Sequence, residues 1–344
     1  MSIPAALREQ STSSRFAAVV AVCLLLALGT YVLSSPNDDG GETANSFFNI
    51  WRYSSSQVCA SGDDLEAALC GAADANKTLI VSVVNAAFAG EDGLLDLFLE
   101  GLREGEGTAH LLRHVLLVAT DLPAFRRCRT LGLVRCYHLP SSVNGSEFSS
   151  EQLYMSEGFI RMMWQRIRFL ADVLNHGYSF IFTDLDVIWL RNPIPMLNRT
   201  GEEDFLISSD KFNGRPLDLA NELNTGFFFV APSNGTVALF GEWYGSWNGT
   251  AGRKEQDVLN RMKWGGAFGR LGVRARVLDT ARFSCFCQDS KDARQVTTVH
   301  ANCCRTMRAK VADLKAVLRV FKHLNGTSSK VRWPAHAECH KSWG

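Results

Sequence analysis

Two aspartates separated by a single residue are the strongest chemical signal in this sequence. Asp184 and Asp186 come directly after the apolar run YSFIFT and shortly before Trp189. In an extended segment alternate residues point to the same side, so both carboxylates can face one ligand while Leu185 packs away from it. Two carboxylates this close repel each other unless a cation neutralises them. The spacing therefore predicts a site for Mg²⁺ or Mn²⁺ rather than Zn²⁺, with coordination positions left for phosphate oxygens.

Two other interpretations of the same pattern stay open. The acids could cap the turn after the strand or pair with Arg191, because a bare D-x-D recurs freely in proteins. A strand followed by two aspartates is also similar to the nucleophile loop of haloacid-dehalogenase-type phosphatases, in which the first aspartate is phosphorylated. Those enzymes need the loop near the start of the domain and a later acidic motif, and this sequence meets neither condition.

The elements that would position the acids follow an alternating order. Apolar runs predict strands at TLIVSVVN, HVLLVAT, VRCYHL and YSFIFT. A helical pattern at DDLEAALCGAA precedes the first strand. Further helical patterns lie between the strands at LLDLFLEGLREG, 124–131 and SEGFIRMMWQRIRFLADVLNHG, with Gly177 as the stop of the last helix. This order predicts an α/β fold with a parallel sheet and helices on both faces. Ligands bind outside the carboxyl ends of such strands, where the two aspartates fall.

The N-terminal region predicts a membrane anchor. Residues 16–33 carry no charge, and about 1.5 Å per helical residue makes this stretch roughly 27 Å long, enough to span a bilayer core. Arg8 and Arg15 precede it, so the positive-inside rule places the N-terminus in the cytosol and the rest of the chain across the membrane. A cleaved signal peptide is the alternative, but the apolar stretch is longer than the usual signal core and no clear cleavage site follows.

Sequons and cysteines indicate an oxidising, glycosylating compartment. Six Asn-x-Ser/Thr acceptors occur, at Asn76, Asn144, Asn198, Asn234, Asn248 and Asn325. Nine cysteines follow the anchor, namely Cys59, Cys70, Cys128, Cys136, Cys285, Cys287, Cys303, Cys304 and Cys339. Disulfides are favoured over a zinc site, because the CFC and CC pairs lack the two-residue gap of common zinc motifs. Since nine is odd, at least one cysteine is free or pairs with another chain.

The charge of the chain gives little information about its partners. The chain has 36 basic and 35 acidic residues, so its formal charge is close to zero. Nothing in this balance points to nucleic acid or to a polyanionic partner.

Seven segments in a fixed order connect the chain to a known family. They are TLIVSVVNAAFA, HLLRHVLLVATD, MMWQRIRFLADVLNHGYSFIFTDLDVIWLRNP, NELNTGFFFV, KEQDVLN, VLDTARFSCFCQD and TTVHANCC. From about Asp63 to Leu324 the chain resembles the plant nucleotide-diphospho-sugar transferase domain of glycosyltransferase family 77. The resemblance implies an A-type glycosyltransferase fold, a single Rossmann-like nucleotide-sugar-binding domain, behind a transmembrane helix and stem. It also implies a single-pass type II protein of the Golgi apparatus membrane.

The predicted division of the chain follows from the anchor and from this resemblance. It consists of a cytosolic tail at 1–15, a transmembrane signal anchor at 16–33, a stem at 34–62, a glycosyltransferase catalytic domain at 63–330 and a C-terminal tail at 331–344.

The resemblance assigns the metal and nucleotide positions. Asp184 and Asp186 occupy the family's metal-and-diphosphate D-x-D, and His300 in TTVHANCC would complete the metal shell through a neutral imidazole. A core histidine beside a disulfide is the alternative for His300. Arg166 would face the nucleotide phosphates, where a guanidinium can bind two oxygens at once. Asn85, at the end of the first strand, would contact the nucleotide, or would serve as a turn residue.

The sugar pocket is assigned in the same way. Asn224 and Gly226 match a turn that lines the pocket, with the glycine allowing close approach of the ligand. Gln256 and Asp257 match a Q-D pair that would hold the donor sugar near its anomeric carbon. For these two residues the alternative is a polar helix N-terminus that satisfies the helix dipole.

The prediction is a metal-dependent, retaining glycosyltransferase. It would use Mn²⁺ or Mg²⁺ and move a sugar, a pentose such as xylose or arabinose by resemblance, from a UDP-sugar to a cell-wall glycan or glycoprotein. No residue stands out as a nucleophile except Asp257 by position, so front-face attack of the acceptor is favoured. A catalytically silent glycan-binding protein on the same fold is the main alternative, and the phosphatase is the second. A disulfide-linked or Golgi-complex partner through the odd cysteine completes the expectations.

Overall fold

The computed structural model describes residues 63–140, 150–152, 154–197, 203–250, 252–324 and 331–344. All of these residues belong to one compact unit. The predicted cytosolic tail, anchor and stem, which together span 1–62, lie outside the described residues. Within the described ranges no helix is both long enough and apolar enough to cross a bilayer.

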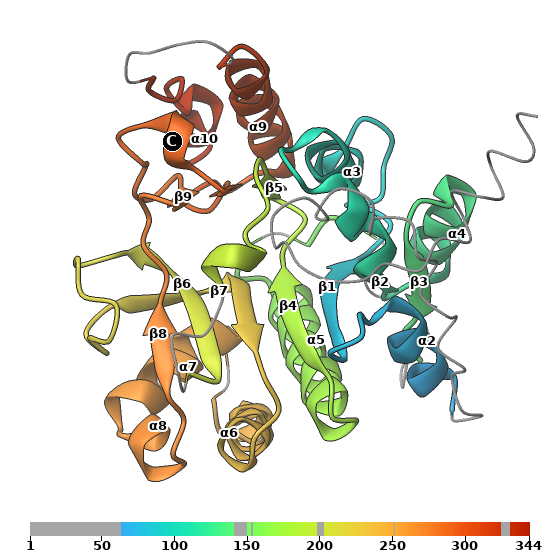
Figure 1. The fold of residues 1–344 in the computed structure, drawn as a ribbon, viewed down its shortest axis with the longest axis vertical. Coiled ribbons are helices and arrows are strands. Elements are labelled where there is room, and N and C mark those ends of the chain that lie inside the picture. Colours follow the sequence, from blue (N-terminus) through green and yellow to red (C-terminus); the bar gives the residue numbers. More distant parts are fainter. Residues whose placement is uncertain (1–62, 141–149, 153, 198–202, 251, 325–330) are drawn as a thin grey trace, which may run out of the picture. The chain divides into compact units, whose positions relative to one another are not determined.

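A seven-stranded sheet forms the centre of this unit (Figure 1). Its strands lie in the order β3 (Arg135–His138), β2 (Val115–Ala119), β1 (Thr78–Val84), β4 (Ser179–Thr183), β7 (Glu222–Val230), β6 (Phe205–Lys211) and β8 (Ala275–Val277). The first four strands are parallel, as predicted. However, β7 runs antiparallel to both β4 and β6, because a loop joins β6 directly to β7 without a crossover helix. Because β6 is antiparallel to β7 and parallel to β8, both β6 and β8 point in the same direction as β4. The prediction of a parallel sheet is therefore right for every strand of this sheet except β7.

Helices cover both faces of the sheet. One face packs against α3 (Leu94–Glu104), α4 (Leu122–Leu131) and α9 (Met307–Lys322). The other face packs against α2 (Asp64–Ala72), α5 (Glu157–Asn175), α6 (Asn234–Gly245), α7 (Glu255–Trp264) and α8 (Ala267–Arg270). Ile80 and Ile181 enter the first core while Leu79 and Phe180 enter the second. This alternation explains why the strands read as continuous apolar runs.

A second sheet, of three strands, brings residues 283–300 close to the turn after β4. In it β10 (Thr298–His300) lies between β5 (Val187–Trp189), to which it is antiparallel, and β9 (Phe283–Cys285), to which it is parallel. In Figure 1 this sheet lies near α9 and α10 (Ala337–Lys341). Short 3-10 helices complete the connections, at η2 (Ala109–His114), η3 (Ile194–Met196), η4 (Trp247–Gly249) and η5 (Ala293–Gln295).

Disulfides hold several of these connections, as the sequence predicted. The described pairs are Cys128–Cys136, Cys287–Cys303 and Cys304–Cys339. The CC pair and the second cysteine of CFC are thus disulfide-bonded and are not zinc ligands. Among the described residues the free cysteine is Cys285, and it is only 3% exposed. This thiol therefore does not reach a partner chain, which removes it as the predicted intermolecular link.

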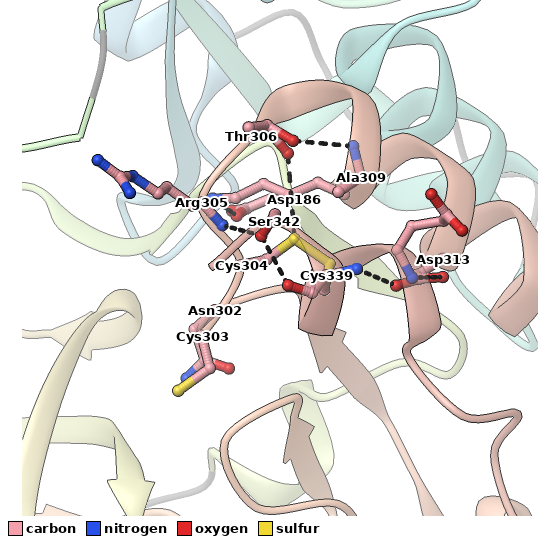
Figure 2. The surroundings of a disulfide bond; sticks show 12 residues. Asp186, Asn302, Cys303, Cys304, Arg305, Thr306, Ala309, Asp313, Cys339 and Ser342 are labelled. Atoms are coloured by element: carbon pink, nitrogen blue, oxygen red, sulfur yellow. Dashed lines mark hydrogen bonds and ion pairs between the residues drawn. A yellow bond between two sulfur atoms is a disulfide. The ribbon is translucent and has the colours of Figure 1, made fainter. Parts of the chain in front are cut away.

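Residues 331–344, predicted to form a C-terminal tail, pack against the rest of the unit. Cys339 is 2% exposed and is bonded to Cys304, immediately before α9. Figure 2 shows this disulfide together with two flanking hydrogen bonds. Arg305 N donates to Ser342 Oγ at 2.9 Å, and Cys339 N donates to Asp313 Oδ2 at 2.8 Å. The segment is consequently part of the folded domain.

Three of the six sequon asparagines lie within the described residues. Asn76, Asn234 and Asn248 are all exposed. An attached glycan would therefore not disturb the core at any of these three positions. The remaining sequons, at Asn144, Asn198 and Asn325, lie outside the described residues.

Candidate active site

The turn after β4 places the two aspartates at the carboxyl end of the central sheet. Asp184 N donates to Gly226 O at 2.7 Å, and Val187 N donates to Asp184 O at 3.1 Å. These bonds fix the backbone on both sides of the acidic pair, so the strand edge holds the carboxylates in place. The predicted location is confirmed.

The three-stranded sheet places His300 next to this turn. His300 pairs with Val187 in the antiparallel β5–β10 ladder, and Ala301 N donates to Asp186 O at 3.0 Å. As a result His300 Nε2 lies 3.3 Å from Asp186 Oδ1. His300 thus faces the aspartates, and it is buried, with only 8% of its surface exposed.

Together Asp184, Asp186 and His300 form a group of side chains that could hold a metal ion, and we call these three residues the metal cluster. One ligand atom from each lies within 4.8 Å of the others. Gly226 makes room for this arrangement, because a Cβ at that position would lie 2.3 Å from His300 Cε1 and 2.9 Å from Asp184 Oδ2. Two carboxylates and one imidazole nitrogen suit Mn²⁺ or Mg²⁺. The residues present therefore fit the predicted metal.

Arg166 approaches the cluster from α5 and pairs with two carboxylates of the protein. Its Nη1 lies 2.7 Å from Asp184 Oδ1, and its Nη2 lies 2.5 Å from Glu255 Oε1. The side chain is 3% exposed and lies over the ring of Phe182. Because both terminal nitrogens are engaged by protein carboxylates, Arg166 orients Asp184. The paired state of Asp184 also disfavours the phosphatase interpretation, which needs this carboxylate as a free nucleophile.

Lys310, in the first turn of α9, is a cation that the sequence did not reveal. Its Nζ lies 2.7 Å from Asp186 Oδ2, and its side chain is 22% exposed. Partial exposure leaves the ammonium accessible from the cavity while Asp186 holds it. Each aspartate of the pair therefore has its own basic partner.

The surroundings shift the pKa values of the two aspartates in opposite directions. Burial raises the pKa of Asp184 to about 6, although the neighbouring Arg166 guanidinium opposes that rise. Burial acts in the same direction on Asp186, but Lys310 and His300 outweigh it and hold the pKa of Asp186 below its usual value. Desolvation disfavours the charged form of His300, yet Asp186 outweighs this effect and raises the pKa of the imidazole. Asp186 is thus the more firmly ionised of the two carboxylates.

A polar network next to the cluster centres on Asp210, at the end of β6. Asn224 Nδ2 donates to its Oδ1 at 2.8 Å, Asn302 Nδ2 donates to the same oxygen at 2.7 Å, and Gln256 Nε2 donates to Oδ2 at 3.1 Å. Asn224 Oδ1 also accepts from Gly226 N at 2.9 Å. The structure therefore brings Asn224, Gly226 and Gln256 together as predicted, around a carboxylate that the prediction missed.

Asn85 lies in the predicted site, whereas Asp257 faces a different cavity. Asn85 is 1% exposed, and its Oδ1 accepts from Phe88 N at 3.0 Å. Its side chain lines the same cavity as the metal cluster. Asp257 instead lines a neighbouring cavity, and its half-exposed carboxylate lies 3.8 Å from Lys254 Nζ. Among the two cavities, Asp257 thus lines only the one that does not contain the aspartate pair.

One cavity of about 280 Å³ connects these groups. Its lining includes the cluster and the Asp210 network as well as Asn85, Arg166, Glu255 and Lys310. The mouth carries aromatic side chains, among them Tyr154 and Trp343. A metal cluster, basic groups and amide donors in one concave site are suited to binding a phosphorylated sugar derivative.

The buried Arg166–Glu255 pair yields a stability prediction. Glu255 is 2% exposed, so Arg166→Met would leave its charge without its basic partner. We expect the free energy of unfolding to fall by about 3–5 kcal/mol in urea titrations, because an unpaired buried charge costs that much. Arg166→Met/Glu255→Gln should recover much of the loss.

An exposed pair on the same helix provides the control. Arg161 pairs with Glu157 at 2.7 Å, with the two side chains 31% and 88% exposed. Arg161→Met should therefore change the free energy of unfolding by no more than about 0.5 kcal/mol. Equal effects of the two single variants would show that the Arg166 pair is not buried in solution.

Comparison with known proteins agrees with this geometry. Residues 110–314, which include all three members of the metal cluster, match the family model described as nucleotide-diphospho-sugar transferase. The uncharacterized protein At1g28695 of Arabidopsis thaliana is 43% identical over 331 residues, which cover 94% of each chain. Beta-arabinofuranosyltransferase RAY1 of Arabidopsis thaliana is 28% identical over 178 residues, which cover 51% of this chain and 31% of RAY1.

A solved structure is similar at lower identity. The galactosyltransferase LgtC in complex with donor and acceptor sugar analogs is 12% identical, with a TM-score of 0.42, and the match covers 73% of this chain and 97% of LgtC. That likeness is too distant to indicate a function. The family match and the full-length relative suffice: the chain belongs to the nucleotide-diphospho-sugar transferase family of glycosyltransferases.

Proposed function

We propose that this glycosyltransferase depends on Mn²⁺ or Mg²⁺ and moves a pentose from a UDP-sugar to a hydroxyl group of a cell-wall glycan or glycoprotein, with retention of configuration. The observation that carries the proposal is the cluster of Asp184, Asp186 and His300 on a cavity that also contains Lys310. These groups combine the ligands of a hard cation with a basic group for phosphate oxygens.

The balance of charge supports a bound cation. Arg166 and Lys310 provide two formal positive charges, whereas Asp184, Asp186 and Glu255 provide three negative ones. A divalent cation would make this balance positive, which suits an anionic diphosphate. When bound, such an ion supplies Lewis-acid stabilisation of the charge on the leaving nucleotide diphosphate.

The side chains around the metal cluster have separate roles in the proposed reaction. Lys310 is accessible from the cavity and would pair with a diphosphate oxygen, whereas Arg166 keeps Asp184 in its orientation. Asp210 and Gln256 would bind hydroxyl groups of the donor sugar, whereas Asp257 does not line this cavity. The acceptor hydroxyl would then attack the anomeric carbon from the face that the diphosphate leaves, and its proton would pass to the departing diphosphate.

The choice of a pentose rests on a relative. RAY1 carries the name beta-arabinofuranosyltransferase, and its match covers part of this chain. This supports arabinose or xylose over a hexose as the donor sugar.

We also propose that the chain is a single-pass type II protein of the Golgi membrane with a lumenal catalytic domain. Support comes from the uncharged stretch at 16–33 and from the positive charges before it. The disulfides and the exposed sequon asparagines are compatible with a lumenal domain. Protection of the folded domain from added protease in sealed microsomes would test this orientation.

Release of UDP from a donor is the direct test. The full-length chain is incubated with UDP-arabinofuranose, UDP-xylose or UDP-glucose, with MnCl₂ or with EDTA, and free UDP is measured. We expect one of the pentose donors to be hydrolysed fastest. The rate should fall by at least about 100-fold with EDTA, because the charge on the leaving group would lose its main stabilisation.

Two results would count against the proposal. UDP release that is indifferent to EDTA would exclude the metal. Binding of glycans without UDP release from any donor would favour a catalytically silent glycan-binding protein on the same fold.

A further inference from the structure

The mouth of the active-site cavity has an aromatic wall that the proposed mechanism does not use. Tyr154 and Trp343 both line the cavity and are 40% and 52% exposed. Their ring centroids lie 6.3 Å apart at an interplanar angle of 75°. Phe159, which also lines the cavity, packs against Tyr154 with ring centroids 5.5 Å apart. We define Tyr154 and Trp343 as the aromatic wall.

The wall is fixed in position before any ligand binds. Trp343 Nε1 donates to Cys303 O at 2.9 Å, which sets the orientation of the indole. Lys254 Nζ lies 5.5 Å from the centroid of the Tyr154 ring. Rings that are already held lose little conformational freedom on binding, so their contact area converts more fully into affinity.

The Cys304–Cys339 disulfide is the main tether of Trp343. It joins the backbone just before α9 to the helix that precedes Trp343 (Figure 2). Ser342 strengthens the junction, since its Oγ donates to Cys339 O at 2.6 Å and accepts from Arg305 N at 2.9 Å. The same short stretch of chain leads from His300 to Lys310. The disulfide therefore links the aromatic wall to the metal cluster.

The depth of each group indicates which substrate the wall would meet. Asn85 and Asp186 are 1% and 5% exposed, so they form the floor of the cavity. The donor, whose diphosphate needs the cluster, must fill this floor first. The second substrate then approaches from the mouth, where about half of each aromatic side chain is exposed. Exposed tyrosine and tryptophan rings offer an apolar face with a polar edge, which matches the C–H face and the hydroxyl groups of a sugar ring.

We propose that Trp343 and Tyr154 form the acceptor subsite, in which a sugar ring of a carbohydrate acceptor stacks on the indole. The Cys304–Cys339 disulfide acts as a positioning element for Trp343. This inference rests on the proposed function and adds to it the class of acceptor and the residues that bind it.

The subsite is tested by comparing transfer of the sugar to an acceptor with hydrolysis of the donor by water. The full-length chain receives UDP-[¹⁴C]arabinofuranose or UDP-[¹⁴C]xylose and a pool of oligosaccharides released from plant cell walls, and label in oligosaccharide is divided by label in free sugar. We expect Trp343→Ala to lower this ratio at least about tenfold, because hydrolysis needs only water while transfer needs a positioned acceptor. Trp343→Phe should restore most of the ratio.

Two matched controls separate the subsite from general damage. Trp264, which is 60% exposed and lines the neighbouring cavity, provides a tryptophan control: Trp264→Ala should leave the ratio unchanged. Cys304→Ser/Cys339→Ser should lower the ratio, whereas Cys128→Ser/Cys136→Ser removes a disulfide between α4 and β3 and should not. Thermal unfolding of each variant checks that it is folded.

The outcomes are distinguishable from failure of the proposed function. If the wild type releases no UDP from any donor, the proposed function fails. If it releases UDP and the ratio is the same in Trp343→Ala, the acceptor subsite is wrong. If the wild type hydrolyses the donor but labels no oligosaccharide, a carbohydrate acceptor at this wall is also wrong. Weaker binding of UDP by Trp343→Ala, measured by calorimetry, would place the nucleotide base on the indole and overturn the inference.

Discussion

Replacing Asp186 by asparagine is expected to lower sugar transfer and donor hydrolysis by at least about 100- to 1000-fold, the range seen when a preorganised charge-stabilising group is removed. The substitution keeps the size of the side chain and removes its charge. Asp186 contacts both His300 and Lys310, so neutralising it weakens the metal cluster and releases its basic partner together. Steady-state UDP release, with Mn²⁺ affinity measured by calorimetry, would record both effects.

The loss must come from the site and not from unfolding. Asp64→Asn changes an exposed aspartate on α2 in the same chemical way and should leave activity at the wild-type level. Asp186→Asn should unfold cooperatively, since Asp186 lies on a turn whose backbone hydrogen bonds do not involve its carboxylate. Activity within tenfold of the wild type, with unchanged Mn²⁺ affinity, would show that the aspartate pair does not hold the cation.

The local part of the site could be predicted from the sequence because it depends on one strand. The run that ends in FTDLD is apolar along its whole length, so it must be buried on both faces, and its end must lie at the sheet edge. The alternation of side chains then places Asp184 and Asp186 together. None of these steps needs information from another part of the chain.

The residues of the site that lie far from the aspartates in the sequence could not be predicted from local sequence patterns. Nothing in TTVHANCC itself says that His300 faces the aspartates, and the prediction rested on resemblance. The reason is visible only in three dimensions, where β10 pairs with β5 directly after the acidic turn. Lys310 was missed for the same reason, because a lysine in the first turn of an amphipathic helix is usually solvated.

Helix rotation sends the polar residues of KEQDVLN in different directions. Three polar residues in a row begin α7, and successive residues on a helix point about 100° apart. Glu255 is directed into the core toward Arg166, Gln256 toward the cavity, and Asp257 toward a different cavity. The sequence shows that this helix begins with polar residues, but it does not show which of the three faces the ligand.

The packing of the C-terminal segment could not be predicted, because the residues that hold it lie elsewhere in the chain. Residues 331–344 have little apolar periodicity of their own, which is typical of a tail. Their order comes from Cys304 and from hydrogen bonds to Arg305 and Asp313, which belong to a region that precedes them. Disulfide connectivity cannot be read from spacing alone, so this contact was not predictable.

Gly226→Ala is expected to remove activity almost as completely as Asp186→Asn, although it replaces no charged group. The added Cβ would lie 2.3 Å from His300 Cε1 and 2.9 Å from Asp184 Oδ2, so one of these ligands must move. A displacement of about 1 Å at a catalytic group can cost about 100-fold in rate. UDP release and Mn²⁺ affinity should both fall, while overpacking should cost only about 1–3 kcal/mol of stability.

A double-variant cycle would show that the clash with His300 is the cause. His300→Ala removes the imidazole, so adding Gly226→Ala to it should reduce activity much less than Gly226→Ala reduces the activity of the wild type. Gly241→Ala, on α6 where an added Cβ meets nothing within 4 Å, should leave activity unchanged. If the effects of His300→Ala and Gly226→Ala on activity simply multiply, the glycine matters for a reason other than the space it leaves for the metal cluster.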